Sequence, residues 1–118
     1  MKREYKAYLE DILECIERIE EYVDRMNEVD FYENYQVQDA VLRRLEIIGE
    51  AVKRIPQNIK DKYPNIPWRK VAGLRDVLIH GYSGVNLKRV WKIIIENLPE
   101  LKSQIIDIID SIKKDEIK

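Results

Sequence analysis

The sequence predicts an all-α protein, an antiparallel up-down bundle of four main helices whose last helix is kinked or broken at Pro99. Apolar residues make up 45% of the 118 positions and charged residues 36%, which is typical of helices with one buried stripe and a solvated outer face. Only four Gly and four Pro interrupt the chain, which disfavours strands and hairpins. The apolar residues recur at three- and four-residue spacing. We expect one helical domain over residues 1–118.

Two apolar stripes predict the first two helices. The first stripe predicts an amphipathic helix over about residues 3–28. The segment NEVDFYENY then breaks the pattern. The second stripe predicts a helix from Val37 to Ile55. Gly49 lies inside it at a cost of about 1 kcal/mol relative to Ala, which indicates close approach of another backbone.

The remaining elements follow from proline, glycine and asparagine signals. Residues 56–67 hold three of the four prolines and predict a connection with one short helical turn. Pro67 suits the first position of a third helix, WRKVAGLRDVLIH, which Gly81 caps at its end. Asn86 is expected to cap a fourth helix, LKRVWKIIIENL. Pro99 interrupts that helix before the segment ELKSQIIDIIDSIKK.

The composition also restricts location and cofactors. The opening residues MKREYKAYLEDILE carry a charge every few positions, unlike a signal peptide, and no apolar run approaches the ~20 residues that cross a bilayer. We therefore expect a cytoplasmic protein with no membrane partner. Cys15 is the single cysteine, and its place on an apolar helical face predicts a core residue. One His and one Cys cannot complete a Zn²⁺ shell, so we expect no metal and no cofactor.

The net charge of −1 is unevenly spread along the chain. Residues 1–34 carry eleven acids and five bases, whereas residues 35–118 carry sixteen bases and eleven acids. The most biased stretch, 53–75, has seven bases and one acid. A charge run is usually a solvated face. This one leads into the only histidine of the chain, and we expect its Arg69 and Lys70 to attract a phosphate-bearing ligand such as RNA.

The stretch LRDVLIHGY, residues 74–82, collects groups that suit acid–base chemistry on a phosphate. Asp76 and His80 are four positions apart, so on a helix they share a face, and the carboxylate would orient the imidazole. Arg75 has a side chain long enough to reach around the same turn and clamp a phosphate. An activated Ser or Cys, a phosphate-binding Gly loop and clustered metal-binding carboxylates are missing. Metal-free cleavage of RNA fits, because there the substrate's own 2′-hydroxyl is the nucleophile.

Each of these residues also has a structural interpretation. A lone histidine in the last turn of a helix, such as His80, is commonly a capping or packing residue. Arg75 could form a surface ion pair with Asp76 or Glu96, and Tyr82 could pack its ring over the helix end.

The pattern Arg75-x4-His80-x-Tyr82 resembles the signature of HepT toxins, in the HEPN superfamily of helical ribonucleases. The segments LRRLEIIGEAVKRIP, NIPWRKVAGLRDVLIHGY and VWKIIIENLPEL also resemble family blocks, in the family's order, and they cover most of residues 36–101. The resemblance implies an RNA-cleaving toxin, a helical homodimer whose two Arg–His motifs share a cleft. It further implies a cognate MNT-type nucleotidyltransferase antitoxin that adenylylates Tyr82. Asp76 departs from the Asn that is common after the motif arginine.

The residues give their own reason to expect a dimer. Cleavage by the 2′-hydroxyl needs a base for the attacking oxygen and an acid for the leaving 5′-oxygen, and each chain has one histidine. A two-fold interface would supply two, although Tyr82 could serve instead. Two other functions remain open: a non-catalytic helical module that docks a nucleotidyltransferase and gates its nucleotide, and a plain dimerisation scaffold.

Overall fold

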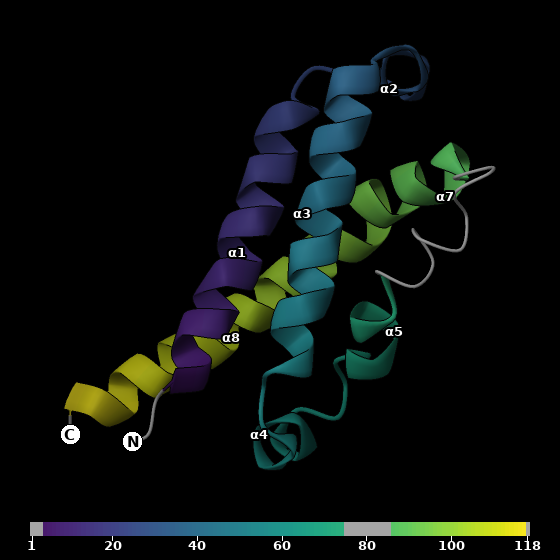
Figure 1. Ribbon diagram of the computed structural model, residues 1–118. Coiled ribbons are helices and arrows are strands. Elements are labelled where there is room, and N and C mark those ends of the chain that lie inside the picture. Colours follow the sequence, from purple (N-terminus) through teal and green to yellow (C-terminus); the bar gives the residue numbers. More distant parts are fainter. Residues whose placement is uncertain (1–3, 75–85, 118) are drawn as a thin grey trace.

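The computed structural model describes residues 4–74 and 86–117, and every regular element in these ranges is a helix (Figure 1). The predicted all-α class is therefore confirmed. No helix of the described ranges is long and apolar enough to span a membrane. The elements, in chain order, are α1 (Glu4–Tyr22), α2 (Glu28–Glu33), α3 (Tyr35–Lys53), α4 (Gln57–Lys62), α5 (Trp68–Ala72), α7 (Leu87–Lys92), the π-helical segment η2 (Ile93–Asn97) and α8 (Leu98–Ile117).

Helices α1 and α3 lie side by side and run in opposite directions (Figure 1). The guanidinium carbon of Arg54, just past the end of α3, lies 5.9 Å from the ring centroid of Tyr8, near the start of α1. A cation over an aromatic face is attracted by the ring quadrupole, so this contact helps to hold the two helix ends together.

Helix α8 packs against α1 and is antiparallel to it. Lys6, near the start of α1, forms an ion pair of 3.1 Å with Glu116, near the end of α8. Glu20, near the end of α1, forms one of 2.9 Å with Lys102, near the start of α8. Exposed pairs of this kind contribute about 0–1 kcal/mol each, so they set the register of the two helices more than their stability.

The core is built from the apolar stripes of these three long helices. A buried Leu or Ile side chain contributes about 1.5–3 kcal/mol through the hydrophobic effect, so the stripes provide most of the stability. The stripe residues with 0–1% exposure are Leu9, Ile12, Ile16, Ile19, Val41, Leu45, Ile48, Val52, Ile105 and Ile108. Cys15 is 2% exposed, which confirms it as a core residue.

Helix α1 ends at Tyr22 and is shorter than predicted, although the apolar stripe continues beyond it with Val23. Arg25 adopts a left-handed backbone conformation with φ of 65°. Asn27 then starts α2 with a capping box: its side chain accepts a hydrogen bond from the Asp30 N–H (2.8 Å), and the Asp30 carboxylate accepts one from the Asn27 N–H (3.1 Å). The prediction of one helix through residue 28 is therefore wrong. The N-x-x-D spacing was the available sequence signal.

Three elements begin close to where the sequence predicts them. They are the second helix, the short helical turn of the connection and the fourth helix. Asn34 caps α3, and the predicted turn after Pro56 is α4. The predicted third helix begins as α5 at Trp68, directly after Pro67. It ends at Ala72 with Gly73 as its C-cap, so the predicted helix does not continue unbroken past this glycine. The residues from Arg75 onward, with the predicted Gly81 cap, lie outside the described ranges. Asn86 caps α7 through a hydrogen bond from the Arg89 N–H (3.1 Å).

The irregularity predicted at Pro99 lies before that residue. The backbone remains helical through Pro99, which sits in the first turn of α8. Directly upstream, η2 forms the wider hydrogen-bond pattern in which the Leu98 N–H donates to the carbonyl of Ile93. A proline inside a helix has no N–H to donate and its ring crowds the preceding turn, so a widened turn at this position accommodates it without a break.

Candidate functional site

The four residues of the predicted Arg–His motif lie outside the described ranges. Arg75, Asp76, His80 and Tyr82 all belong to residues 75–85, so their mutual geometry stays a prediction. The structure does define the two elements between which this segment runs. Helix α5 leads into it, and α7 begins directly after it.

Helix α5 is held in place by its first buried residue. The Trp68 side chain is 9% exposed, and its indole N–H donates to the carbonyl of Tyr63 (3.0 Å). Val71, one turn later, is buried and α5 packs against α3. The intervening Arg69 and Lys70 are exposed to solvent, as their predicted role in attracting RNA requires.

Helix α7 is positioned by α2. The rings of Phe31 and Trp91 have centroids 5.4 Å apart, a separation typical of attractive aromatic pairs. Gln38, which is buried, donates its side-chain amide to the carbonyls of Phe31 (2.9 Å) and Tyr32 (3.0 Å) at the end of α2. Hydrogen bonds from α3 therefore hold α2 in place, and α2 in turn positions α7 through the aromatic pair.

A hollow, which we call the α5–α7 hollow, lies between α5, α7, η2 and the first turns of α8. Leu74, the last residue before the motif segment, lines it, and so does Asn86, the first residue after that segment. The chain thus enters and leaves residues 75–85 at the wall of the hollow. Lys70 lines the hollow as well, whereas Arg69 does not belong to its lining.

The lining of this hollow is strongly charged. Besides Lys70, it contains Lys88, Arg89 and Lys92, all of which are exposed residues of α7. These three cations lie outside the site that the sequence predicts, because the most biased charge run ends at residue 75. Their signal was the pattern K-R-x-x-K at the start of a predicted helix. Three acids also line the hollow: Glu28, Glu96 and Glu100.

The part of the chain that the structure describes holds no group of three or more His, Cys, Asp or Glu side chains arranged to bind a metal ion. His80 lies outside that part, so the expectation of a metal-free site stays a prediction.

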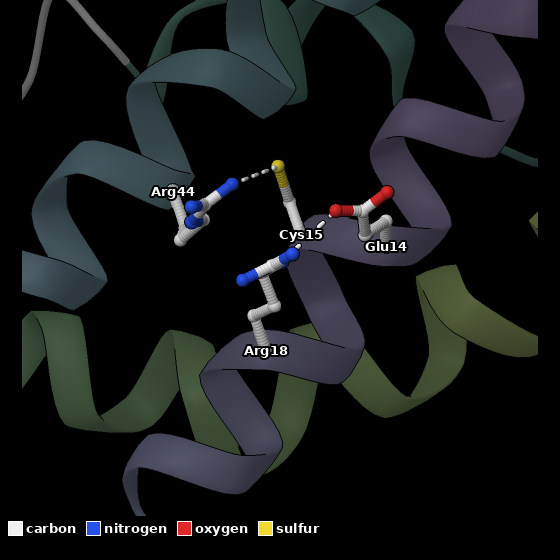
Figure 2. A network of polar contacts seen from close by, with 4 residues as sticks. All are labelled: Glu14, Cys15, Arg18 and Arg44. Atoms are coloured by element: carbon white, nitrogen blue, oxygen red, sulfur yellow. Dashed lines mark hydrogen bonds and ion pairs between the residues drawn. The ribbon is translucent and has the colours of Figure 1, made fainter.

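A separate polar network surrounds Cys15, between α1 and α3 (Figure 2). Its thiol lies 4.0 Å from a guanidinium nitrogen of Arg44, and Arg18 forms an ion pair of 2.9 Å with Glu14 one turn away. Burial raises the pKa of the Cys15 thiol above its ordinary value of 9.0, and the neighbouring Arg44 opposes this shift. A buried, protonated thiol is a poor nucleophile, so the network is structural rather than catalytic.

Comparison with known proteins identifies the family. A model of the HepT-like ribonuclease family, described as "Ribonuclease HepT-like", matches residues 12–108. The chain belongs to the HepT-like ribonuclease family. The matched range contains the whole Arg75–Tyr82 motif and the α5–α7 hollow, so the HepT-like domain includes both the predicted catalytic residues and the charged surface beside them.

Several relatives of this HepT-like chain carry ribonuclease names. "Probable ribonuclease HepT" of Thermococcus cleftensis is 50% identical over 104 residues, which cover 88% of this chain and 94% of the relative. A provisionally named RNase of Methanocaldococcus jannaschii is 46% identical over 116 residues, or 98% of this chain and 96% of the relative.

A third relative, a gamma-glutamylcyclotransferase and provisionally named RNase of the same organism, is 45% identical over 114 residues. The chain spans 51% of the length of this relative. No solved structure matches the chain.

Proposed function

We propose that this chain is a metal-independent endoribonuclease and the toxin of a toxin–antitoxin module. The observation that carries the proposal is the HepT-like ribonuclease match over residues 12–108, within which Arg75-x4-His80-x-Tyr82 falls. The 50% identity to "Probable ribonuclease HepT" over 94% of that relative supports the same activity.

The proposed chemistry uses the substrate's own nucleophile. The 2′-hydroxyl of a ribose attacks the adjacent phosphorus, one group removes its proton, and a second group protonates the leaving 5′-oxygen. His80 is the proposed proton carrier, oriented by Asp76, and the guanidinium of Arg75 stabilises the charge that develops on the phosphate. Cleavage then leaves a 2′,3′-cyclic phosphate on one product and a free 5′-hydroxyl on the other.

A homodimer would complete this proposed site. Each chain has one histidine, so a two-fold axis that brings two motifs together supplies one imidazole as base and one as acid. The proposed regulator is an MNT-type nucleotidyltransferase that adenylylates Tyr82, whose added phosphate would compete with RNA for Arg75.

The decisive experiment incubates RNA with purified protein in EDTA. We expect cleavage by the wild type, with cyclic phosphate ends, and loss of cleavage in Arg75→Ala and His80→Ala. Lys113→Ala, which removes an exposed charge near the end of α8, is the control and should cleave like the wild type. Activity that needs an added divalent ion would contradict metal independence. If the wild type is inactive but still binds the nucleotidyltransferase, the non-catalytic docking module becomes the better account.

A further inference from the structure

Three cations of α7 face the α5–α7 hollow without an acidic partner in the part of the chain that the structure describes. Lys88, Arg89 and Lys92 form no ion pair with any residue in the described ranges, and Lys70 of α5 shares this property. Lys102 of α8, by contrast, pairs with Glu20 of α1. Unpaired cations around a concave surface raise the local concentration of an anionic ligand.

The charge along this wall changes sign at one point. Lys88 and Lys92 are one helical turn apart and share a face of α7. The next charged residues that line the hollow along the same wall are two acids, Glu96 of η2 and Glu100 of α8. The cationic part adjoins Asn86, where the chain leaves the motif segment, and the anionic part lies one to two turns farther along. Glu28 of α2, the third acid of the lining, accepts a hydrogen bond from the Tyr32 hydroxyl. Along the wall formed by α7, η2 and α8, an anionic polymer is therefore favoured at the motif end and disfavoured at the other.

An aromatic side chain lies among these cations. Trp91 is partly buried, lines the hollow, and contacts Phe31 with ring centroids 5.4 Å apart. Aromatic rings interleaved with cations bind single-stranded nucleic acids, because unpaired bases stack on the ring while the cations contact the phosphates. In a duplex the bases are already stacked on each other and cannot reach such a ring.

We infer that the motif end of the α5–α7 hollow binds a single-stranded segment of the RNA substrate, with Lys88 and Lys92 on its phosphates and Trp91 against a base. This inference rests on the proposed ribonuclease function and extends it, because it assigns RNA-binding residues outside the Arg–His motif. Glu96 and Glu100 limit the cationic track to a few nucleotides.

The test measures binding separately from cleavage. A fluorescein-labelled RNA oligonucleotide with 2′-O-methyl riboses cannot be cut by 2′-hydroxyl attack, and its affinity is measured by fluorescence anisotropy at several salt concentrations. The variant is Lys88→Gln/Lys92→Gln. The matched control is Lys113→Gln/Lys114→Gln, which removes the same charge from two exposed lysines of α8 that do not line the hollow.

We expect the α7 variant to bind about tenfold more weakly or worse, and its slope of log affinity against log salt to fall by about 1.4, or 0.7 for each lost phosphate contact. The control should keep both values. Equal affinity and slope in the two double variants would overturn the inference. A duplex of the same sequence should bind more weakly than the single strand, and tighter duplex binding would overturn the single-stranded assignment.

Two further outcomes separate this inference from the proposed function. If the wild type fails to cut unmodified RNA, yet the α7 variant alone loses binding, the ribonuclease proposal fails and the binding site stands. If the wild type cuts RNA and the α7 variant binds normally, the binding site fails and the ribonuclease proposal stands. Loss of nucleotidyltransferase binding in the α7 variant, with RNA binding intact, would assign the surface to the protein partner and overturn the inference.

Discussion

The ring of Trp91 lies against the ring of Phe31, with centroids 5.4 Å apart and planes inclined by 34°. This pair joins α2 to α7, two short helices that are far apart in the sequence. Phe31 is fully buried, and its carbonyl accepts a hydrogen bond from Gln38 of α3. The helix that carries Lys88 and Lys92 is therefore oriented by a contact outside the Arg–His motif.

The pair should be energetically coupled. Close aromatic pairs contribute about 0.5–1.5 kcal/mol beyond the area they bury, so a double-mutant cycle of Phe31→Leu and Trp91→Leu should give a coupling energy near 1 kcal/mol. Urea unfolding of the four proteins measures it. Phe31→Leu combined with Trp68→Leu is the control, since Trp68 packs through α5 and makes no ring contact with Phe31. If the first cycle is as additive as the control, the ring contact has no specific energetic role.

The long helices could be predicted from sequence because their information is local. A stripe such as Leu9, Ile12, Ile16 and Ile19 recurs with the helical period, and the structure buries all four residues completely. The end of α1 could not be placed in the same way. Val23 packs partly against the core after α1 has ended, so the apolar period continues while the hydrogen-bond pattern has already changed.

The surface beside the candidate site could not be predicted, for a different reason. The charge run predicts that Lys70 and its neighbour Arg69 both attract a phosphate-bearing ligand. Only the three-dimensional packing separates them, since Lys70 lines the α5–α7 hollow and Arg69 does not. Lys88 and Lys92 become significant for the same reason: α2 and the Phe31–Trp91 contact bring α7 to the hollow.

Cys15 should make the stability of the protein depend on alkaline pH. Burial raises the pKa of its thiol above the ordinary 9.0, so the unfolded chain loses this proton at a lower pH than the folded one. The protonated thiol makes its full contribution to the free energy of unfolding below pH 9. This contribution is lost as the pH rises toward the folded pKa, and the free energy of unfolding falls by at most about 1.4 kcal/mol per pH unit. Cys15→Val should lack this decline. Urea unfolding between neutral pH and pH 10 measures the difference.

A second alkaline group does not obscure this comparison. The hydrogen bond to Glu28 raises the pKa of Tyr32. This shift also makes the free energy of unfolding decline at alkaline pH. Both proteins contain Tyr32, so its effect cancels in the difference between the wild type and Cys15→Val. Parallel pH curves for the two proteins would show that the Cys15 thiol does not titrate differently in the folded state.

We expect a homodimer at micromolar concentration. Gly49, which the sequence predicts to lie close to another backbone, is buried within the single chain and gives no argument for an intermolecular contact. Three large apolar side chains of the described ranges are exposed instead: Val29 by 60%, Tyr35 by 77% and Ile95 by 52%. Scattered apolar residues need no partner, since only a contiguous apolar patch favours association. The expectation therefore rests on the single histidine of each chain, which a two-fold interface would double. Sedimentation equilibrium over a concentration series decides the point, and a monomer throughout would remove the shared-cleft proposal.

Under the proposed function, Tyr82→Phe should leave the ribonuclease active but insensitive to the proposed antitoxin. The substitution removes the hydroxyl that the proposed adenylylation modifies, and it leaves Arg75 and His80 unchanged. In the wild type, the added nucleotide would place bulk and negative charge within a few residues of both, and its phosphate would compete with RNA for the guanidinium. Modified wild type should therefore bind and cut RNA less, with unchanged helical content by circular dichroism.

Co-expression with an MNT-type nucleotidyltransferase, the proposed antitoxin, tests this directly, with growth and intact mass as the measurements. The wild type should gain the mass of one or more adenylyl groups and lose toxicity, whereas Tyr82→Phe should gain none and stay toxic. Tyr35→Phe is the control, because Tyr35 is 77% exposed and thus accessible to any unspecific transferase. A Tyr35→Phe protein that escapes modification would place the modified hydroxyl on α3. If Tyr82→Phe is neutralised while the wild type gains no mass, the antitoxin acts by forming a complex, and the hydroxyl of Tyr82 has no part in silencing.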